Sequence, residues 1–224
     1  MRLCQERGGQ AKSLLFCGSY GLSDQVLQEK SRWPDASHLP NANNMTIILA
    51  TEEESRLDNE AVVANMRLGL RRFAKSVMVI SCVFEGTRYA MSATAVSELS
   101  LDPPTMLICI NQSASLHAPL AAGADFAINM LHAGQEHIAR NCAGTLRGEA
   151  RFDEGDWQIS DFGPPILNDA QAYFVCRQEQ RIDHGTHSVF IGQVVAASAA
   201  EMIDPLVYVD GRYLAPVQTD VQKE

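Results

Sequence analysis

The chain has 224 residues, of which 46% are hydrophobic, and this favours one core-forming domain with an extension. Its net charge of −9 argues against a nucleic-acid-binding protein, because such proteins need an excess of Lys and Arg to neutralise phosphates. No apolar run approaches the roughly 20 residues of a transmembrane helix, and the run at 14–17 is too short for a secretory signal. We therefore expect a cytoplasmic protein that does not act at a membrane.

The six cysteines include no CxxC pair, and three of them lie within apolar runs. This pattern favours buried free thiols in a reducing compartment over disulfides. Residues 1–57 lack sustained periodicity and are rich in Gly, Ser, Asn and Gln, so we predict a mobile N-terminal extension there. The predicted domain spans residues 58–216, and residues 217–224 form a short C-terminal tail.

An amphipathic helix is predicted at the start of the domain, with Asp58 as its N-cap. Its apolar residues recur at three- and four-residue steps, at Val63, Met66, Leu70 and Phe73.

Two strands joined by a tight turn are predicted next. Residues 77–84 and 88–96 are separated by Glu85-Gly86-Thr87, so a β-hairpin is the simplest interpretation. Pro103 and Pro104 then block a helix and mark a corner. The apolar run at 105–110 predicts a third, buried strand.

The rest of the chain alternates short helices with strands. We predict helices at 116–122 and 135–143, each ended by a glycine, and a long loop over 145–168. Further strands are predicted at 126–131, 172–182, 188–197, 206–209 and 212–214, with Asp210-Gly211 as the turn between the last two. Because strands outnumber helices and no βαβ rhythm appears, the predicted fold is mainly β, an antiparallel barrel decorated by helices.

The stretch 89–115 carries the main candidate site. Two segments rich in hydroxyl and small side chains flank one apolar strand: Ser92, Ala93, Thr94, Ala95 and Ser97 before the corner, and Asn111, Ser113 and Ser115 after the strand. If the corner folds these segments side by side, their N–H and hydroxyl groups line an uncharged groove suited to a flat ligand with a phosphate tail. On composition alone, an ordinary Ser/Thr-rich edge strand beside a core strand explains the stretch equally well.

Several familiar site motifs are missing from the sequence. Neither a GxGxxG fingerprint nor a P-loop occurs, so any nucleotide must be held in another way. His132 and His137 have the wrong spacing for a zinc helix, and His184 and His187 lack a nearby set of further ligands, so we expect no metal site. The absence of a GxSxG elbow leaves a hydrolase weakly supported.

Five segments, in this order, resemble the short-chain flavin reductase family, the reductase components of two-component flavin-dependent monooxygenases of the 4-hydroxyphenylacetate 3-hydroxylase type. They are Arg71-Arg72-Phe73-Ala74 leading into Val77-Met78-Val79-Ile80, Ala90-Met91-Ser92-Ala93-Thr94-Ala95, Ser100-Leu101-Asp102-Pro103-Pro104, Gly185-Thr186-His187, and Phe190-Ile191-Gly192-Gln193-Val194. The resemblance covers roughly residues 62–215. It implies an FMN-binding split β-barrel, a homodimer with flavin sites near the interface, oxidation of NADH or NADPH, and delivery of reduced FMN or FAD to a partner monooxygenase.

The resemblance also implies roles for individual residues. Ser92 to Ala95 match the segment along the isoalloxazine ring, and Ser97, Asn111, Ser113 and Ser115 match the ribityl-phosphate contacts. Phe126 and Asn129 match an aromatic and Asn pattern of the cofactor site, and His187 matches the histidine on the nicotinamide side. Gly-Thr-His at 185–187 replaces the Gly-Asp-His of many relatives, which leaves the choice between NADH and NADPH open.

The hypothesis is direct hydride transfer from nicotinamide C4 to flavin N5, which needs close stacking and no acid–base pair. A non-enzymatic flavin-binding electron-transfer protein on the same barrel is the main alternative. An enzyme like pyridoxamine-phosphate oxidase would need a cluster of basic residues, and residues 86–132 contain only Arg88. A plain binding or assembly module is the remaining alternative.

Overall fold

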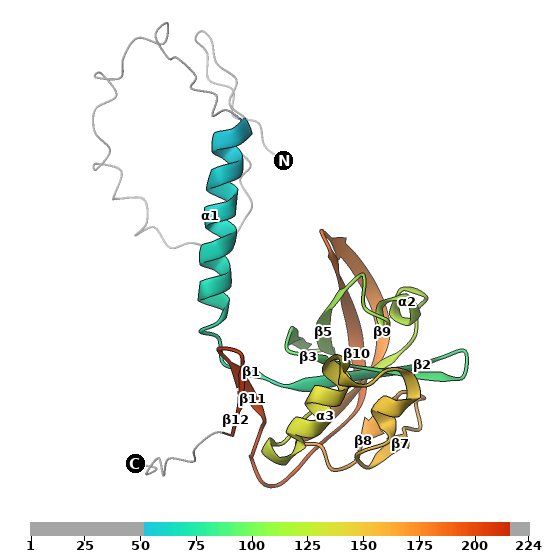
Figure 1. Ribbon diagram of the computed structural model, residues 1–224. Helices are drawn as coiled ribbons and strands as arrows, with labels where there is room; N and C mark the ends of the chain where they lie inside the picture. The colour runs from blue at the N-terminus through green and yellow to red at the C-terminus, as the bar shows by residue number, and fades with distance from the viewer. Residues whose placement is uncertain (1–51, 216–224) are drawn as a thin grey trace, which may run out of the picture. The chain divides into compact units, whose positions relative to one another are not determined.

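The computed structural model describes residues 52–215, with side chains from residue 59 onward (Figure 1). Most of the predicted extension at 1–57, and the predicted tail at 217–224, therefore lie outside the described residues. The first element is helix α1, Glu52–Leu70. The expected N-cap at Asp58 was wrong, because α1 begins before that residue. The acidic run at 52–54 is favoured at a helix N-terminus by the helix dipole, which explains the earlier start.

The apolar side chains of α1 remain exposed in the single chain. Val62 is 63% exposed and Met66 is 61% exposed, and Phe73, just beyond the helix, is 61% exposed. The predicted helix is thus confirmed, whereas its apolar side does not pack into the core of the domain.

A seven-stranded antiparallel sheet forms the body of the domain, with the order β3-β2-β6-β9-β10-β5-β4. Its strands are β2 (Met78–Phe84), β3 (Thr87–Ala93), β4 (Val96–Leu101), β5 (Pro104–Asn111), β6 (Phe126–Met130), β9 (Ala172–His184) and β10 (His187–Ala199). Glu85 and Gly86 both have positive φ, at 50° and 77°, as a two-residue hairpin turn requires. The predicted hairpin and the predicted buried strand at 105–110 are both confirmed. The strand predicted at 88–96 ends earlier, at Ala93, and β4 was not predicted.

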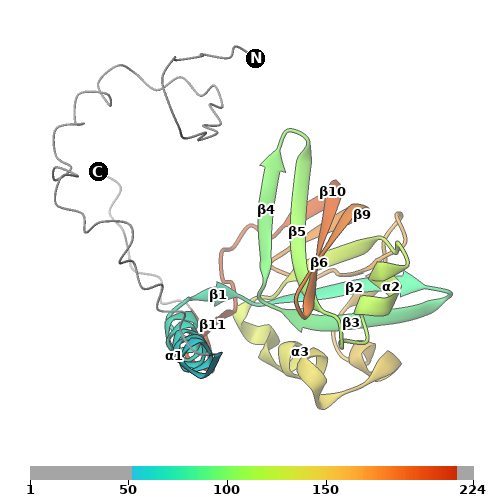
Figure 2. The same cartoon turned by 90° about the horizontal axis from the view of Figure 1, so that it is seen from above.

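The two edge strands of this sheet, β3 and β4, are consecutive in the chain (Figure 2). Only Thr94 and Ala95 separate them, and two residues can span no more than about 10 Å. The sheet must therefore curl until its edges approach each other, although they are not paired. This geometry confirms the predicted mainly β barrel, and it is the split form of such a barrel.

The main core fills the inside of the curled sheet and contains Ile80, Ile108 and Phe190, all fully buried. Gly192 of β10 lies against this core, where a Cβ would come within 2.9 Å of both the Phe126 ring and the Cys176 Cβ. Glycine at 192 is therefore required by the close approach of β10 to its neighbours.

The segment 145–168, which was expected to be one long loop, contains three short elements. They are the 3₁₀ helix η6 (Gly148–Phe152) and the paired strands β7 (Trp157–Ile159) and β8 (Pro165–Leu167). The loop prediction was wrong here because three-residue strands carry too little periodicity to be recognised. All of β8 is buried, and the Ser81 hydroxyl donates a hydrogen bond of 2.5 Å to the Pro165 carbonyl.

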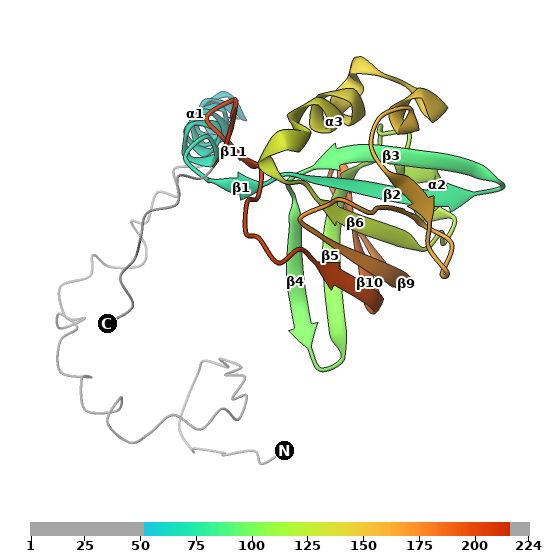
Figure 3. The same ribbon diagram turned by 90° about the horizontal axis from the view of Figure 1, so that it is seen from below.

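The remaining elements lie around the sheet. They are α2 (His117–Ala121), η4 (Ala133–Gln135), α3 (Glu136–Arg140), the π-helical turn η5 (Asn141–Thr145), and the small sheet β1 (Lys75–Ser76), β11 (Val207–Val209) and β12 (Arg212–Leu214). Figure 3 shows α3 beside the β2–β3 hairpin. The predicted helices and the predicted strands from 126 to 214 are confirmed, with small shifts at their ends. Within residues 52–215, no helix is long and apolar enough to cross a membrane.

Candidate functional site

Three of the predicted site residues meet on the outward face of the sheet. His187 begins β10 and lies opposite Asn111, the last residue of β5. The Cys109 N–H donates a 2.9 Å hydrogen bond to the Ala95 carbonyl, which places Ala95 beside the same end of β5. The neighbouring residues Ile110 and Ser188 are fully buried on the inward face, so the alternate residues point outward.

Ser97 lies on the same face but farther away. It is opposite Leu107, four residues before Asn111, which corresponds to about 13 Å along the strand. Its hydroxyl donates to the Glu98 carbonyl at 3.0 Å. The β4–β5 hairpin therefore places the first hydroxyl-rich segment beside the apolar strand β5 and not beside residues 111–115, and Ser97 does not join the cluster at Asn111.

The residues from Asn111 to Ser115 form a polar loop after β5. The Asn111 side-chain oxygen accepts from both the Ser113 N–H and the Ser113 hydroxyl, each at 2.8 Å. This is an Asx turn, in which the side chain organises the backbone locally. Ser113 and Ser115 are exposed, so their hydroxyl groups are accessible at the end of β5.

Ser92, Ala93 and Thr94 lie where β3 leads into β4. The Ser92 hydroxyl donates to the Ala139 carbonyl at 2.6 Å and thereby ties β3 to α3. The three residues border a pocket of about 220 Å³ together with Tyr208 and Tyr213. Thr94 also borders an adjacent pocket of about 340 Å³ that includes Arg71 and Lys75.

The tyrosine pair was missed by sequence reasoning. Tyr208 of β11 and Tyr213 of β12 are opposite each other in the hairpin register, with ring centroids 5.2 Å apart in an edge-to-face arrangement. The Asp210-Gly211 turn was recognised, and counting outward from it would have paired the two rings. No pattern in the sequence, however, indicated that this hairpin borders Ser92–Thr94.

Phe126 and Asn129 are the predicted site residues that the structure places inside the domain. Both are fully buried in β6. The Asn129 amide nitrogen donates to the Val79 carbonyl at 3.1 Å and the Ser81 hydroxyl at 3.0 Å, and its oxygen accepts from the Leu167 N–H at 2.8 Å. Asn129 thus joins β2, β6 and β8. Neither residue reaches the surface of the single chain, because Phe126 points into the main core and Asn129 lies under β8 on the opposite face of β6.

His187 is exposed at the tip of the β9–β10 hairpin. It follows a two-residue turn in which Gly185 has a φ of 56°, a conformation that glycine adopts without strain. Its Nδ1 lies 2.9 Å from the Thr186 hydroxyl. The imidazole is therefore oriented locally and remains accessible to a ligand.

The other histidines considered as metal ligands have separate partners. His132 Nδ1 accepts from the Gly134 N–H at 3.0 Å, and His137 Nε2 lies 3.8 Å from the Glu154 carboxylate. Within the part of the chain that the structure describes, no group of three or more His, Cys, Asp or Glu side chains is placed to hold a metal ion.

The described cysteines are free thiols. Cys82, Cys142 and Cys176 are buried, as expected, and Cys109 is half-buried. Burial raises the pKa of the Cys82 and Cys176 thiols to about 12 and that of Cys142 to about 11, so the three groups stay protonated at neutral pH. Cys4 and Cys17 lie outside the described residues.

Residues 70–215 match the model of the family described as flavin reductase like domain. The chain belongs to this family. The chain is 37% identical over 163 residues to the reductase component of the FADH(2)-dependent resorcinol hydroxylase from Rhizobium sp. strain MTP-10005, a match covering 72% of this chain and 91% of that protein. It is 36% identical over 163 residues to the FMN reductase (NADH) RutF of Methylorubrum populi, covering 73% and 80% of the two chains.

Solved flavin reductases share the fold. The NADH:FAD oxidoreductase SgcE6 of Streptomyces globisporus C-1027 has a TM-score of 0.65 and 29% sequence identity, covering 70% of this chain and 94% of that one. The flavin reductase component BorF of a bacterial two-component tryptophan halogenase has a TM-score of 0.64 at 29% identity, covering 70% and 99%. The resemblance inferred from five short segments is therefore confirmed over nearly the whole described domain.

Proposed function

We propose that this flavin reductase uses NADH or NADPH to reduce FMN or FAD and supplies the reduced flavin to a separate flavin-dependent monooxygenase. Support comes from the family match and from relatives named as reductase components and as NADH-dependent FMN reductases. The observation that carries the proposal is that Ala95, Asn111 and His187, distant in sequence, meet on one outward face of the sheet.

The residues present fit a flavin. Small side chains at Ser92–Ala95 permit close approach of a flat ring, and the exposed Ser115 hydroxyl offers a neutral donor for a ribityl phosphate. When bound, the flavin and nicotinamide supply the chemistry themselves, as a direct hydride transfer. The protein then has to bind and orient the two rings and keep them in contact. In this proposal His187 orients the nicotinamide, and Phe126 and Asn129 act from the core by holding β6 in place.

We further propose that the chain acts as a homodimer in the cytoplasm. The outward face of the seven-stranded sheet is apolar beside the site residues. Its apolar residues lie in neighbouring positions of β5, β9 and β10 and are Leu107, Cys109, Ile182, Val189 and Ile191. Ile182 is 52% exposed in the single chain. A second copy would cover this outer-face patch beside the flavin groove. Buried free thiols support a reducing compartment.

The activity is tested by mixing the purified protein with FMN or FAD and each nicotinamide under anaerobic conditions. We expect the absorbance of the flavin to fall much faster than in the same mixture without protein. In air, turnover should not require a partner oxygenase. Tight flavin binding with slow bleaching would instead support the electron-transfer protein. No bleaching with any of the four combinations would contradict the proposal.

The dimer is tested by light scattering of an Ile191→Glu variant. A charge in the outer-face patch should shift the mass from two chains to one, because burying an unpaired carboxylate is strongly unfavourable. Ile159→Glu is the matched control, since Ile159 is 56% exposed on β7, away from the patch. A wild-type protein with the mass of one chain, or an equal response of both variants, would contradict the homodimer.

A further inference from the structure

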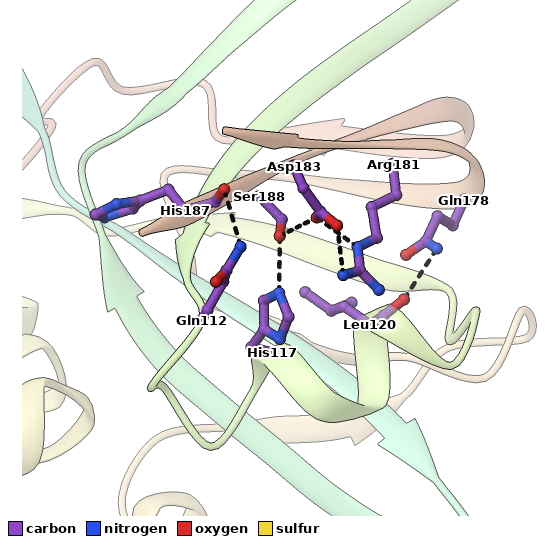
Figure 4. A network of polar contacts seen from close by, with 8 residues as sticks. All are labelled: Gln112, His117, Leu120, Gln178, Arg181, Asp183, His187 and Ser188. Carbon is purple, nitrogen blue, oxygen red and sulfur yellow. Dashed lines mark hydrogen bonds and ion pairs between the residues drawn. The ribbon is translucent and has the colours of Figure 1, made fainter. Parts of the chain in front are cut away.

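We propose that a hydrogen-bonded chain of His117, Ser188 and Asp183 positions His187 for the nicotinamide, so that these three act as positioning residues of the reductase. This inference rests on the proposed role of His187. His117 Nε2 lies 2.8 Å from the Ser188 Oγ, and Ser188 Oγ lies 2.6 Å from Asp183 Oδ1 (Figure 4). Three elements are joined in this way: α2, β10 and β9.

The donors and acceptors in this chain can be assigned. An ionised carboxylate only accepts, so the single Ser188 hydroxyl proton goes to Asp183. The Ser188 oxygen must then accept from His117, which requires a proton on His117 Nε2. Arg181 donates to both Asp183 oxygens, at 2.7 and 2.8 Å, and holds the pKa of that carboxyl below its usual range, so Asp183 remains an acceptor.

Ser188 is the residue through which the chain acts on His187. It is fully buried and follows His187 directly in β10, so the two side chains point to opposite faces of the sheet (Figure 4). Holding the Ser188 side chain inward fixes the backbone from which the His187 imidazole projects outward. This restraint is needed because His187 immediately follows the hairpin turn. The strands of a long hairpin separate most readily at this end.

Gln112 supplies a second restraint on the same turn. Its backbone N–H donates to the Thr186 carbonyl at 2.9 Å, and its side-chain nitrogen lies 3.5 Å from the His187 carbonyl. Gln112 belongs to the polar loop after Asn111, and His117 begins the helix that follows this loop. The network therefore couples the proposed flavin-phosphate loop to the proposed nicotinamide residue.

The arrangement is unsuited to nucleophilic catalysis despite containing Asp, Ser and His. Ser188 stands between the other two, its proton is directed to the carboxylate, and it is closed off from solvent. A serine nucleophile instead needs an exposed oxygen whose proton passes to the histidine. His117 also packs edge-on against the core residue Phe190, with ring centroids 5.6 Å apart. Positioning is the role that fits this burial.

The decisive variant is Ser188→Ala, with Gln178→Ala as the matched control. Gln178 also ties β9 to α2, by a 3.0 Å bond from its side-chain nitrogen to the Leu120 carbonyl, but at the other end of that helix (Figure 4). We expect Ser188→Ala to raise KM for NADH about fivefold and to leave flavin affinity within about twofold, because the two hydrogen bonds that join Ser188 to Asp183 and His117 are lost. Gln178→Ala should leave both constants near wild type.

A double-mutant cycle tests whether the network acts through His187. In a His187→Ala background, adding Ser188→Ala should leave KM for NADH unchanged, because the positioned group is already absent. His117→Gln, which keeps a donor near Ser188, should retain most of the wild-type KM, whereas His117→Phe should behave like Ser188→Ala. Additive effects of the two alanine variants, or equal effects of Ser188→Ala and Gln178→Ala, would overturn the proposal.

Hydrogen exchange of residues 184–190 gives a readout that does not depend on activity. Ser188→Ala should speed exchange in this segment, and Gln178→Ala should not. If the wild-type protein reduces no flavin, the proposed function fails, yet faster exchange would still support the restraint on the turn. Unchanged exchange in Ser188→Ala would overturn the positioning network whether or not the protein is active.

Discussion

The end of β5 and the middle of β6 each contain an asparagine that the family pattern assigns to the cofactor site, and they differ in every physical respect. Asn111 is half-buried at a strand end, and its side-chain oxygen shapes the exposed loop that follows. Asn129 is fully buried in β6 and makes three hydrogen bonds to two other strands, β2 and β8. The comparison shows that residue type and motif position identify a family pattern but do not distinguish an accessible residue from a buried one that supports the fold.

Asn129→Ala should give the largest effect. It removes three buried hydrogen bonds and leaves the Val79 carbonyl and the Leu167 N–H without their partner, so we expect a loss of about 2–5 kcal/mol in the free energy of unfolding. Urea denaturation measures this loss, with Asn111→Ala in the same assay. If both variants lost the same stability, the contrast between the two asparagines would be broken.

Gly192→Ala tests the buried region around β6, the second of the two regions compared. The added Cβ would lie 2.9 Å from the Phe126 ring, inside the main core on the opposite face of β6 from Asn129. Overpacking of this kind destabilises by about 1–3 kcal/mol. Thermal unfolding would show the effect, and an unchanged melting temperature would indicate that β10 can move away from β6 and β9.

Asn111→Ala should change binding more than stability. Its Asx turn lies at the surface, so we expect a loss below about 1 kcal/mol in the free energy of unfolding and roughly tenfold weaker flavin binding. Titration of the protein with FMN measures the affinity. Wild-type affinity in a folded Asn111→Ala variant would place the phosphate away from this loop, for example toward the pocket with Lys75 and Arg71.

His187→Ala should have the smallest effect on stability, because the imidazole is exposed at the hairpin tip. We expect KM for the nicotinamide to rise about tenfold, by about 1.4 kcal/mol of lost binding, with flavin affinity nearly unchanged. His184→Ala is the control, since His184 lies opposite His187 in the hairpin register. Unchanged steady-state kinetics with both NADH and NADPH would rule out the proposed role.

Much of the fold was predictable because the signals are local. The residue types of Glu85-Gly86 and Asp210-Gly211 predict tight turns. The strands on either side are predicted by alternating apolar and polar residues and by β-branched side chains. The family followed from five short segments whose order along the chain is itself specific. The start of α1 and the strands β4, β7 and β8 were missed. A helix start can shift by a turn, β4 follows β3 after only two residues, and a three-residue strand is recognised only through its partner.

The sequence by itself determined the order of strands, the tight turns and the membership in the flavin reductase family, because each depends on neighbouring residues. The tertiary structure alone decided which predicted site residues lie at the surface and which are buried. The pairing of β10 with β5 brings His187 to Asn111, the pairing of β11 with β1 brings Tyr208 to the pocket beside Thr94, and the main core and β8 cover Phe126 and Asn129. These contacts join residues far apart in the chain, and no local pattern specifies them.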